Sequence, residues 1–303
     1  MRLLDPSYDT VFKYLLEDLE IAKGLISRII GKEIVELTPL PQEETSIELE
    51  IKYIALPLHR QDYVVAVKTI DENGNSKIEK IMIEMQKSSI LPEISRFRQY
   101  IADKYHHRSQ INGKEYDLPI TTIYIVEKTF NKKLPPILYV KNQYIDRLTG
   151  KPYEGETDEF VDLLNHESYF IQTELLPDDY RNELLRILSI FSPNYKIKLG
   201  RKERYIDLPE ELIDRFKDKI LHKIIRRLQL AENDNKLTTA LDLEISYEDE
   251  WERTLAALEK ERKAKEEAKQ KLLETAKLLK NLNVDIKTIM EKTGLSREEI
   301  ENL

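Results

Sequence analysis

A carboxylate and an amide stand two residues apart at the end of a β-type run. The run "KIEKIMIEMQ" covers residues 77–86, and Glu84 and Gln86 close it. A second β-rich run at 62–70 begins with Asp62, and Asn73-Gly74 between the two runs is a strong hairpin signal. Facing residues in a hairpin lie within roughly 5 Å of one another. The sequence therefore indicates that these three polar residues meet at one end of a hairpin.

The length of the connecting loop decides which face each side chain takes. An even two-residue loop would set Asp62 beside Met85 and leave Glu84 and Gln86 on the other face. An odd loop such as residues 73–75, or one β-bulge, pairs Asp62 with Glu84 or Gln86 and brings all three onto one face. We predict the odd register.

Two carboxylates held together without a cation repel each other, and one of them would take up a proton. Mg²⁺ prefers oxygen ligands and commonly uses one or two carboxylates together with substrate phosphate. Asp62 and Glu84 therefore predict a site for Mg²⁺, with Mn²⁺ as an alternative. Gln86 cannot act as a general base, but its amide can donate to a phosphate or orient a water molecule. The competing interpretation is a strand that ends in polar residues as it leaves the core.

The elements that must position these residues alternate between helix and strand. The predicted elements are a helix from about Ser7, capped by Asp5 or Ser7, to Gly31; strands at 46–58, 62–70, 77–86 and 120–128; and a helix at 91–107. This order predicts a mixed α/β core.

Four short motifs follow one another along the first part of the chain, and their order and spacing are more specific than any one of them alone. They are Asp9-x-x-Phe12-Lys13, Asp62, Ile83-Glu84-Met85-Gln86 and Arg96-x-x-x-Tyr100, followed by Gly113, Tyr116, Leu118 and Pro119. Together they resemble the PD-(D/E)XK nuclease family transposases, also called recombination-promoting nucleases. The resemblance covers residues 5–130 and, less closely, the helical region to about residue 245.

The resemblance implies a restriction-endonuclease-like mixed sheet flanked by helices, and a site that cleaves DNA. It makes Asp62 and Glu84 the metal-binding carboxylates. Gln86 stands where the wider superfamily has lysine, so this chain resembles an E-x-Q branch. Asp9 would be the acidic residue of the first helix, acting on the site through water, or it would serve only as a favourable charge at the helix amino terminus.

Three further residues would contact substrate if the resemblance holds. Lys13 would reach toward the site or lie along the surface, and Arg96 and Tyr100 would grip phosphate or brace Glu84. For Tyr100, simple packing is the favoured alternative. The function implied is a Mg²⁺-dependent DNA endonuclease, a hydrolase of phosphodiester bonds that acts in transposition or recombination. The alternative is a catalytically inactive, nuclease-like DNA-binding or scaffold protein that works through its C-terminal helices.

Four regions follow from the sequence pattern. We expect a nuclease-like core at 1–145, a helical region with a basic patch at 146–246, a long helix at 247–281 and a small helical pair at 282–303. The basic patch, between Phe191 and Leu230, has eleven basic residues against six acidic ones. It is either a solvated helix face or a phosphate-contacting surface.

The long helix carries an imperfect heptad seam. Its positions are Trp251, Leu255, Leu258, Arg262, Lys265, Lys269, Leu272, Ala276 and Leu279. The basic middle of the seam leaves two alternatives, a coiled coil that joins copies into a homo-oligomer or a solvated helix that pairs only at its ends. In the helical pair, Gly294 is the predicted stop of the first helix, and Ser296 with Glu299 predicts a capping box for the second. Such a pair is typical of a DNA reader or a docking module.

The composition of the chain excludes several classes of protein and of metal site. The 303 residues carry a net charge of −8 and no cysteine, which excludes disulfides and thiolate metal sites. No apolar run approaches the roughly 18–20 residues that cross a bilayer. No zinc-ligand spacing, nucleophile–histidine pair or glycine-rich phosphate loop stands out. We expect a cytoplasmic protein without a membrane partner.

Overall fold

The computed structural model describes most of the chain in two compact units, residues 1–245 and residues 246–303. The described residues are 1–40, 63–70, 74, 76–86, 98, 101–102, 105–106, 108–111, 113–127, 129–155, 158–199, 202–214 and 217–302.

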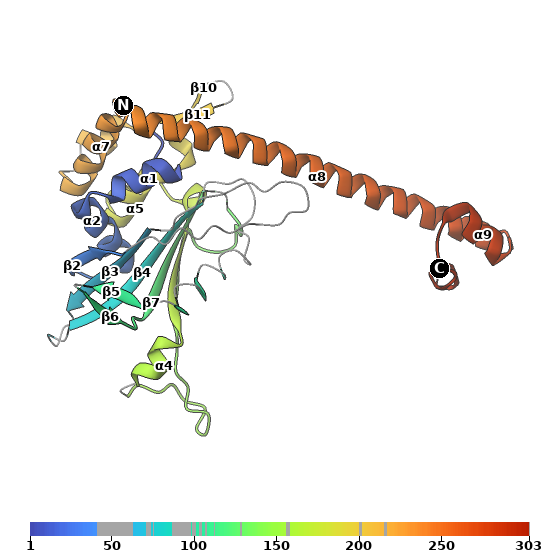
Figure 1. Cartoon of the computed structure of the whole chain (residues 1–303), viewed down its shortest axis with the longest axis horizontal. Helices are drawn as coiled ribbons and strands as arrows, with labels where there is room; N and C mark the ends of the chain where they lie inside the picture. Colours follow the sequence, from blue (N-terminus) through green and yellow to red (C-terminus); the bar gives the residue numbers. More distant parts are fainter. Residues whose placement is uncertain are drawn as a thin grey trace. The chain divides into compact units, whose positions relative to one another are not determined.

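A six-stranded mixed sheet lies at the centre of the first unit (Figure 1). In spatial order its strands are β2 (Ile34–Pro39), β3 (Tyr63–Ile70), β4 (Ser76–Gln86), β7 (Ile120–Val126), β9 (His166–Gln172) and β8 (Ile137–Val140). β2 pairs antiparallel with β3, and β3 pairs antiparallel with β4. β4, β7 and β9 pair parallel with one another, and β8 pairs antiparallel with β9. The predicted mixed α/β class is confirmed.

The three parallel strands end at the same side of the sheet. Gln86 of β4 pairs with Val126 of β7, which pairs in turn with Gln172 of β9. We call this side the carboxyl edge. All seven residues of β7 are buried, as expected for a parallel strand that is covered on both faces.

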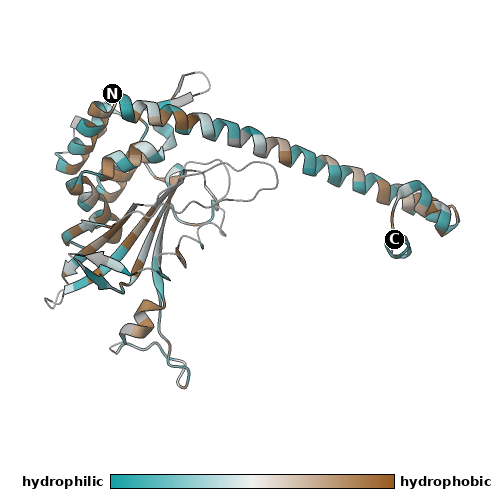
Figure 2. Ribbon diagram, viewed as in Figure 1, coloured by the Kyte–Doolittle hydropathy of each residue, from teal (hydrophilic) through white to brown (hydrophobic). Residues whose placement is uncertain are grey.

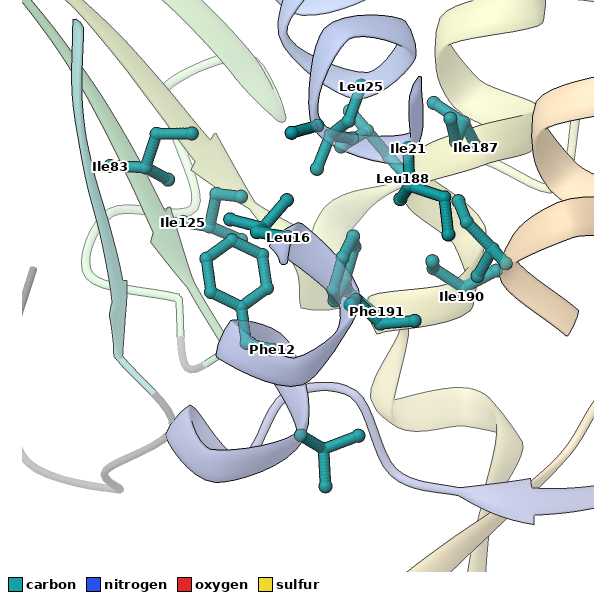
Figure 3. Packing of buried hydrophobic residues seen from close by; sticks show 14 of the residues in the cluster. Phe12, Leu16, Ile21, Leu25, Ile83, Ile125, Ile187, Leu188, Ile190 and Phe191 are labelled. Carbon is teal, nitrogen blue, oxygen red and sulfur yellow. The ribbon is translucent and has the colours of Figure 1, made fainter. Parts of the chain in front are cut away.

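Helices cover one face of the sheet and form the main core with it (Figure 3). Phe12, Ile21 and Ile187 from three different helices belong to the same buried cluster as Ile83 of β4 and Ile125 of β7. In the part of this unit for which bounds are described, the helices are α1 (Asp9–Leu16), α2 (Leu19–Ile30), α4 (Glu159–Leu163), α5 (Glu183–Leu188), α6 (Glu210–Asp214), α7 (Lys219–Ala231) and the first turns of α8 (Asn235–Asn281). Three short 3₁₀ turns lie at Thr173–Leu175, Ser189–Phe191 and Pro193–Tyr195.

The amino-terminal helix is two helices, so the single helix predicted from the sequence is wrong. The first ends at Leu16, with Glu17 as its C-cap, and Asp18 caps the second, because its side chain accepts hydrogen bonds from the backbone amides of Glu20 and Ile21. The predicted stop at Gly31 is confirmed by a left-handed backbone there, with φ at 67°.

The cap of α1 comes from the far end of the unit. Neither Asp5 nor Ser7 caps the helix, since Tyr8 is the N-cap residue and makes no side-chain cap. Instead, the Glu244 carboxylate accepts hydrogen bonds from the amides of Asp9 at 2.7 Å and Thr10 at 2.9 Å. An anion at a helix amino terminus also interacts favourably with the helix dipole. Glu244 of α8 therefore supplies the acceptor for the first backbone amides of α1.

The predicted hairpin between β3 and β4 is confirmed. The ladder pairs Tyr63 with Ile83 and Ile70 with Ser76, so five residues connect the strands instead of three. Gly74, in this connection, has a left-handed φ of 82°. The connection is odd in number, and the predicted odd register is confirmed for the described ladder.

Several strands lie where the sequence pattern did not predict them. Strand β2 was missed, and the strand expected at 46–58 lies outside the described residues. The region 146–246 is not purely helical, because β9 joins the central sheet and β10 (Lys196–Leu199) and β11 (Lys202–Asp207) pair with β1 (Arg2–Leu4). A further hairpin joins β5 (Ser109–Ile111) and β6 (Lys114–Tyr116).

The second unit contains most of α8, then α9 (Ile286–Thr293) and α10 (Arg297–Glu301). α8 begins at Asn235, twelve residues before the predicted start, because its first turns bury Leu237, Leu241 and Ile245 in the core of the first unit. A small core joins its end to the two short helices through Ala276, Ile289, Leu295 and Ile300.

The local signals for the terminal helical pair are confirmed. Gly294 ends α9 in the left-handed conformation, with φ at 69°. Ser296 and Glu299 form a reciprocal capping box at the start of α10.

Candidate functional site

The three residues at the centre of the predicted site lie at the limit of the described structure. Glu84 and Gln86 lie at the end of β4, where they pair with Tyr124 and Val126 of β7. Their side chains lie outside the described part of the chain, and so does Asp62, which precedes Tyr63 in the sequence. The backbone of β4 thus carries positions 84 and 86 to the carboxyl edge.

The two faces of β4 contribute to different cores. Ile81 and Ile83 belong to the main core that the helices cover, whereas Met82 belongs to a second cluster with Val64 and Ala66. Side chains alternate between faces along a strand. Positions 84 and 86 therefore follow Met82 on the face opposite α1.

Asp9 and Lys13 are brought together on α1. The Lys13 ammonium donates to the Asp9 carboxylate at 2.5 Å, and the two side chains are 23% and 25% exposed. Phe12, which stands between them in the sequence, packs in the main core with Ile83 and Ile125 (Figure 3). α1 therefore lies beside β4, with its acidic residue and its lysine paired to each other. The described contacts do not bring this pair to positions 84 and 86.

Arg96 and Tyr100 lie outside the described residues, so their roles as substrate contacts stay predictions.

A buried ion cluster that sequence reasoning missed joins three segments near the carboxyl edge. The Lys196 ammonium bonds the Glu127 carboxylate and lies 3.3 Å from Asp5 Oδ2. Asp5 Oδ1 accepts from the Ser7 amide at 2.9 Å and from the Ser7 hydroxyl at 2.6 Å. Asp5 is buried, and the Lys196 side chain is only 3% exposed. Glu127 directly follows Val126, the partner of Gln86, so the cluster lies at the end of the neighbouring strand.

The cluster keeps Lys196 charged. Burial by itself favours the neutral amine, but the carboxylates of Asp5 and Glu127 outweigh it and raise the pKa of Lys196 above its usual value. In the sequence, Asp5 fitted a helix cap and Lys196 fitted a surface patch. Only the long-range pairing of the two segments reveals their partnership.

Several basic side chains of the expected basic patch form ion pairs with acidic side chains of the same unit. Arg204 binds Asp242 at 2.9 Å, Lys223 binds Asp18 at 2.9 Å, and Arg227 binds Glu17 at 3.0 Å. With Lys196, that makes four of the eleven basic residues. Lys217, Lys219 and Arg226 are exposed. For the described part of the patch, the arrangement favours helix packing over a phosphate-contacting surface.

At the opposite end of the parallel strands, a cleft of 370 Å³ is lined by residues that include Glu79, Thr121 and Glu167. Glu79 is buried, accepts from the Thr121 hydroxyl at 3.0 Å, and lies 3.7 Å from the Lys32 ammonium. Of the predicted site residues whose side chains the structure describes, neither Asp9 nor Lys13 lines this cleft.

Within the described residues, no three His, Asp or Glu side chains gather as a metal site would require, and the side chains of Asp62 and Glu84 are not among those described. No described helix combines the length and the apolar character needed to cross a bilayer. Comparison of the chain with protein-family models, with curated proteins and with solved structures gave no match.

Proposed function

We propose that this protein is a Mg²⁺-dependent endodeoxyribonuclease of the PD-(D/E)XK type. The observation that supports it best is the register of β3 and β4, in which Tyr63 lies opposite Ile83. The same register continued by one pair would set Asp62 opposite Glu84. Opposed residues share a face and lie within roughly 5 Å, which is the spacing that two ligands of one ion require.

The donor set fits a hard divalent cation. Asp62 and Glu84 would offer carboxylate oxygens, which Mg²⁺ prefers, and Mn²⁺ accepts the same ligands. When bound, such an ion polarises a phosphoryl group and lowers the pKa of a coordinated water molecule.

The position of the site within the fold also supports the proposal. The carboxyl ends of parallel strands are where α/β proteins commonly bind ligands, and β4, β7 and β9 end together at this edge. The Gln86 amide would orient the attacking water or donate to a phosphate oxygen. Lys13 neutralises Asp9 in the described structure, so neither residue is proposed to contact the scissile phosphate directly.

A plasmid-nicking experiment tests the activity. We expect the purified protein to nick supercoiled DNA with Mg²⁺ or Mn²⁺, and Glu84→Ala to lose far more than the roughly 10–100-fold typical of an outer-shell ligand partner. Asp62→Asn should behave in the same way. Glu33→Gln, which removes an exposed carboxylate before β2, is the matched control and should retain full activity.

The alternative is a nuclease-like protein that binds DNA or serves as a scaffold without cleaving. Gln86 in place of lysine favours it, because no positive charge stands at that position. Equal inactivity of the wild type and Glu84→Ala, with retained DNA binding in EDTA, would support this alternative. Nicking by Glu84→Ala at the wild-type rate would reject the proposed site.

A further inference from the structure

The cleft at the amino ends of β4, β7 and β9 is separate from the proposed nuclease site, which lies at their carboxyl ends. Its volume of 370 Å³ is within the range of about 300–1,000 Å³ that is typical of small-molecule sites. These strand ends lie at the lower end of the sheet in Figure 1, and Figure 2 shows hydrophilic and hydrophobic residues next to each other on the strands. All of the residues that line the cleft belong to the first unit.

The most deeply placed charge in the cleft is a carboxylate with an open acceptor. Glu79 is 3% exposed, and its Oε2 accepts from the Thr121 hydroxyl at 3.0 Å. Glu79 Oε1 is also buried, and no residue that the structure describes donates a hydrogen bond to it. The Lys32 ammonium lies 3.7 Å from Oε1, which is longer than a hydrogen bond. A buried carboxylate is stabilised when both oxygens accept hydrogen bonds, so Oε1 suits a donor that enters from the cleft.

A second carboxylate that lines the cleft lies on the same face of the sheet. Ile81, two residues after Glu79, pairs with Thr121, and Thr121 pairs with Glu167. Paired positions share a face, and so do positions two apart along a strand. Glu167 is half-buried, and its Oε2 accepts from the Tyr139 hydroxyl at 2.5 Å. The inner part of the cleft therefore attracts a cation and repels phosphate or any other anion.

The rim of the cleft carries mainly the opposite charge. Its exposed charged residues are Lys77, Lys141 and Glu154. With Glu79 and Glu167, the described lining thus has three acidic and two basic residues, a balance of −1. A ligand that matches this pattern has a cation at one end and an anionic group at the other.

The walls suit an organic ligand rather than a metal ion. Tyr144, Pro152 and Tyr153 line the cleft and offer apolar and aromatic surface between the floor and the rim. Aromatic side chains pack against methylene groups and attract cations. Among the side chains that the structure describes, no three His, Asp or Glu residues gather as a metal site would require.

We propose that this cleft binds a free basic amino acid of the lysine type. The side-chain ammonium donates to Glu79 Oε1, where a charge-assisted hydrogen bond replaces an unmade one. The methylene chain lies against the tyrosines, and the α-carboxylate lies between Lys77 and Lys141. The net charge of +1 on such an amino acid complements the balance of the lining.

Isothermal titration calorimetry of the full chain with three related ligands tests the proposal. Lysine carries both charged ends, cadaverine lacks the carboxylate, and norleucine lacks the side-chain ammonium. We expect lysine to bind with a Kd below about 1 mM, and each of the other two ligands to bind about tenfold or more weakly.

A substitution at the floor locates the binding. Glu79→Gln keeps an oxygen for the Thr121 hydroxyl but removes the charge, so it should weaken lysine binding by about tenfold or more. Glu115→Gln, at an exposed carboxylate on β6 outside the cleft, is the matched control and should leave the Kd unchanged. Circular dichroism confirms that both variants stay folded.

Substitutions at the rim test the other end of the ligand, at exposed positions where little change in stability is expected. Lys77→Met with Lys141→Met should reduce the affinity for lysine to that of cadaverine, and cadaverine should bind this variant no more weakly than it binds the wild type. Lys132→Met, at an exposed lysine outside the cleft, should change neither affinity.

The absence of any heat of binding with lysine at about 10 mM would overturn the proposal. Unchanged lysine binding by Glu79→Gln would overturn it equally, because the ligand would then occupy another surface. Norleucine or cadaverine binding as tightly as lysine would overturn the assignment of the two charged ends. These readouts are independent of DNA cleavage, so they stand whether or not the protein is a nuclease.

Discussion

At the scale of single residues, the buried Lys196 ammonium has two carboxylate partners that come from distant segments. It is a buried cation between Asp5 and Glu127, which join the amino terminus, the end of β7 and the start of β10. A buried ion pair contributes little when intact, because desolvation offsets the attraction. Removal of one partner is costly, because a buried charge is left uncompensated.

Lys196→Met should therefore lower the free energy of unfolding by about 3–5 kcal/mol in urea denaturation. Lys132→Met, at an exposed lysine, is the control and should change it by less than about 0.5 kcal/mol. Combining Lys196→Met with Asp5→Asn and Glu127→Gln should recover part of the loss, since no charge then remains unpaired. Equal stability of Lys196→Met and Lys132→Met would contradict the cluster's role.

Lys196 also makes the free energy of unfolding depend on pH. Because the pKa of Lys196 is raised in the folded protein, its contribution is complete below the unfolded value of about 10.4 and is lost as pH rises through the folded value. The stability difference between wild type and Lys196→Met should be constant from about pH 6 to about pH 9 and should shrink in more alkaline solution. Urea titrations at several pH values measure this difference.

At the scale of elements, the cap of α1 shows how distant segments complete one another. Glu244→Ala should lower the free energy of unfolding by about 0.5–2 kcal/mol, because the amides of Asp9 and Thr10 lose their acceptor. Glu250→Ala, at an exposed position farther along α8, is the matched control and should have a much smaller effect. Thermal unfolding followed by circular dichroism measures both, and similar losses in the two variants would refute the capping role.

Elements with local signals were predictable from the sequence. The hairpin register followed from alternation and from a turn around Gly74, and Gly31, Gly294 and the Ser296 capping box marked helix ends. These features depend on residues a few positions apart. The physical rules that specify them therefore act within the window that a sequence pattern covers.

Elements that depend on distant partners were missed. The break at Asp18 is a separate case, because its cap is local, but the apolar run that continues through α1 and α2 concealed it. Strand β9 gains its place by pairing with β7 and β8, which lie far from it in the sequence order of the predicted core. For the site, the sequence predicted the odd register of the described β3–β4 ladder, but it assigned Lys196 to the surface because its partners lie 69 or more residues away.

At the scale of the whole molecule, the two units differ in the size of their cores. The buried cluster of the second unit comprises Ala276, Ile289, Leu295 and Ile300, whereas the main core of the first unit joins helices to the central sheet. A small core supplies little hydrophobic stabilisation. The end of α8, with α9 and α10, should therefore open at a lower free energy than β4 or β7.

Native-state hydrogen exchange measures this difference. Ile289→Ala removes a fully buried side chain and should accelerate exchange of amides between 276 and 301 while leaving protection of β7 unchanged. Met290→Ala, on the same helix but 37% exposed, should have a smaller effect. Equal loss of protection in both units would show instead that the chain unfolds as one cooperative body.

The pairing of β1 with β11 and the Glu244 cap on α1 have a consequence for synthesis. The first dozen residues emerge from the ribosome long before their partners at 205–207 and 244. Because chains are made at only about 5–20 residues per second, this segment waits many seconds without its strand or its acceptor. Residues 2–10 are thus among the last parts of the first unit to acquire their final surroundings.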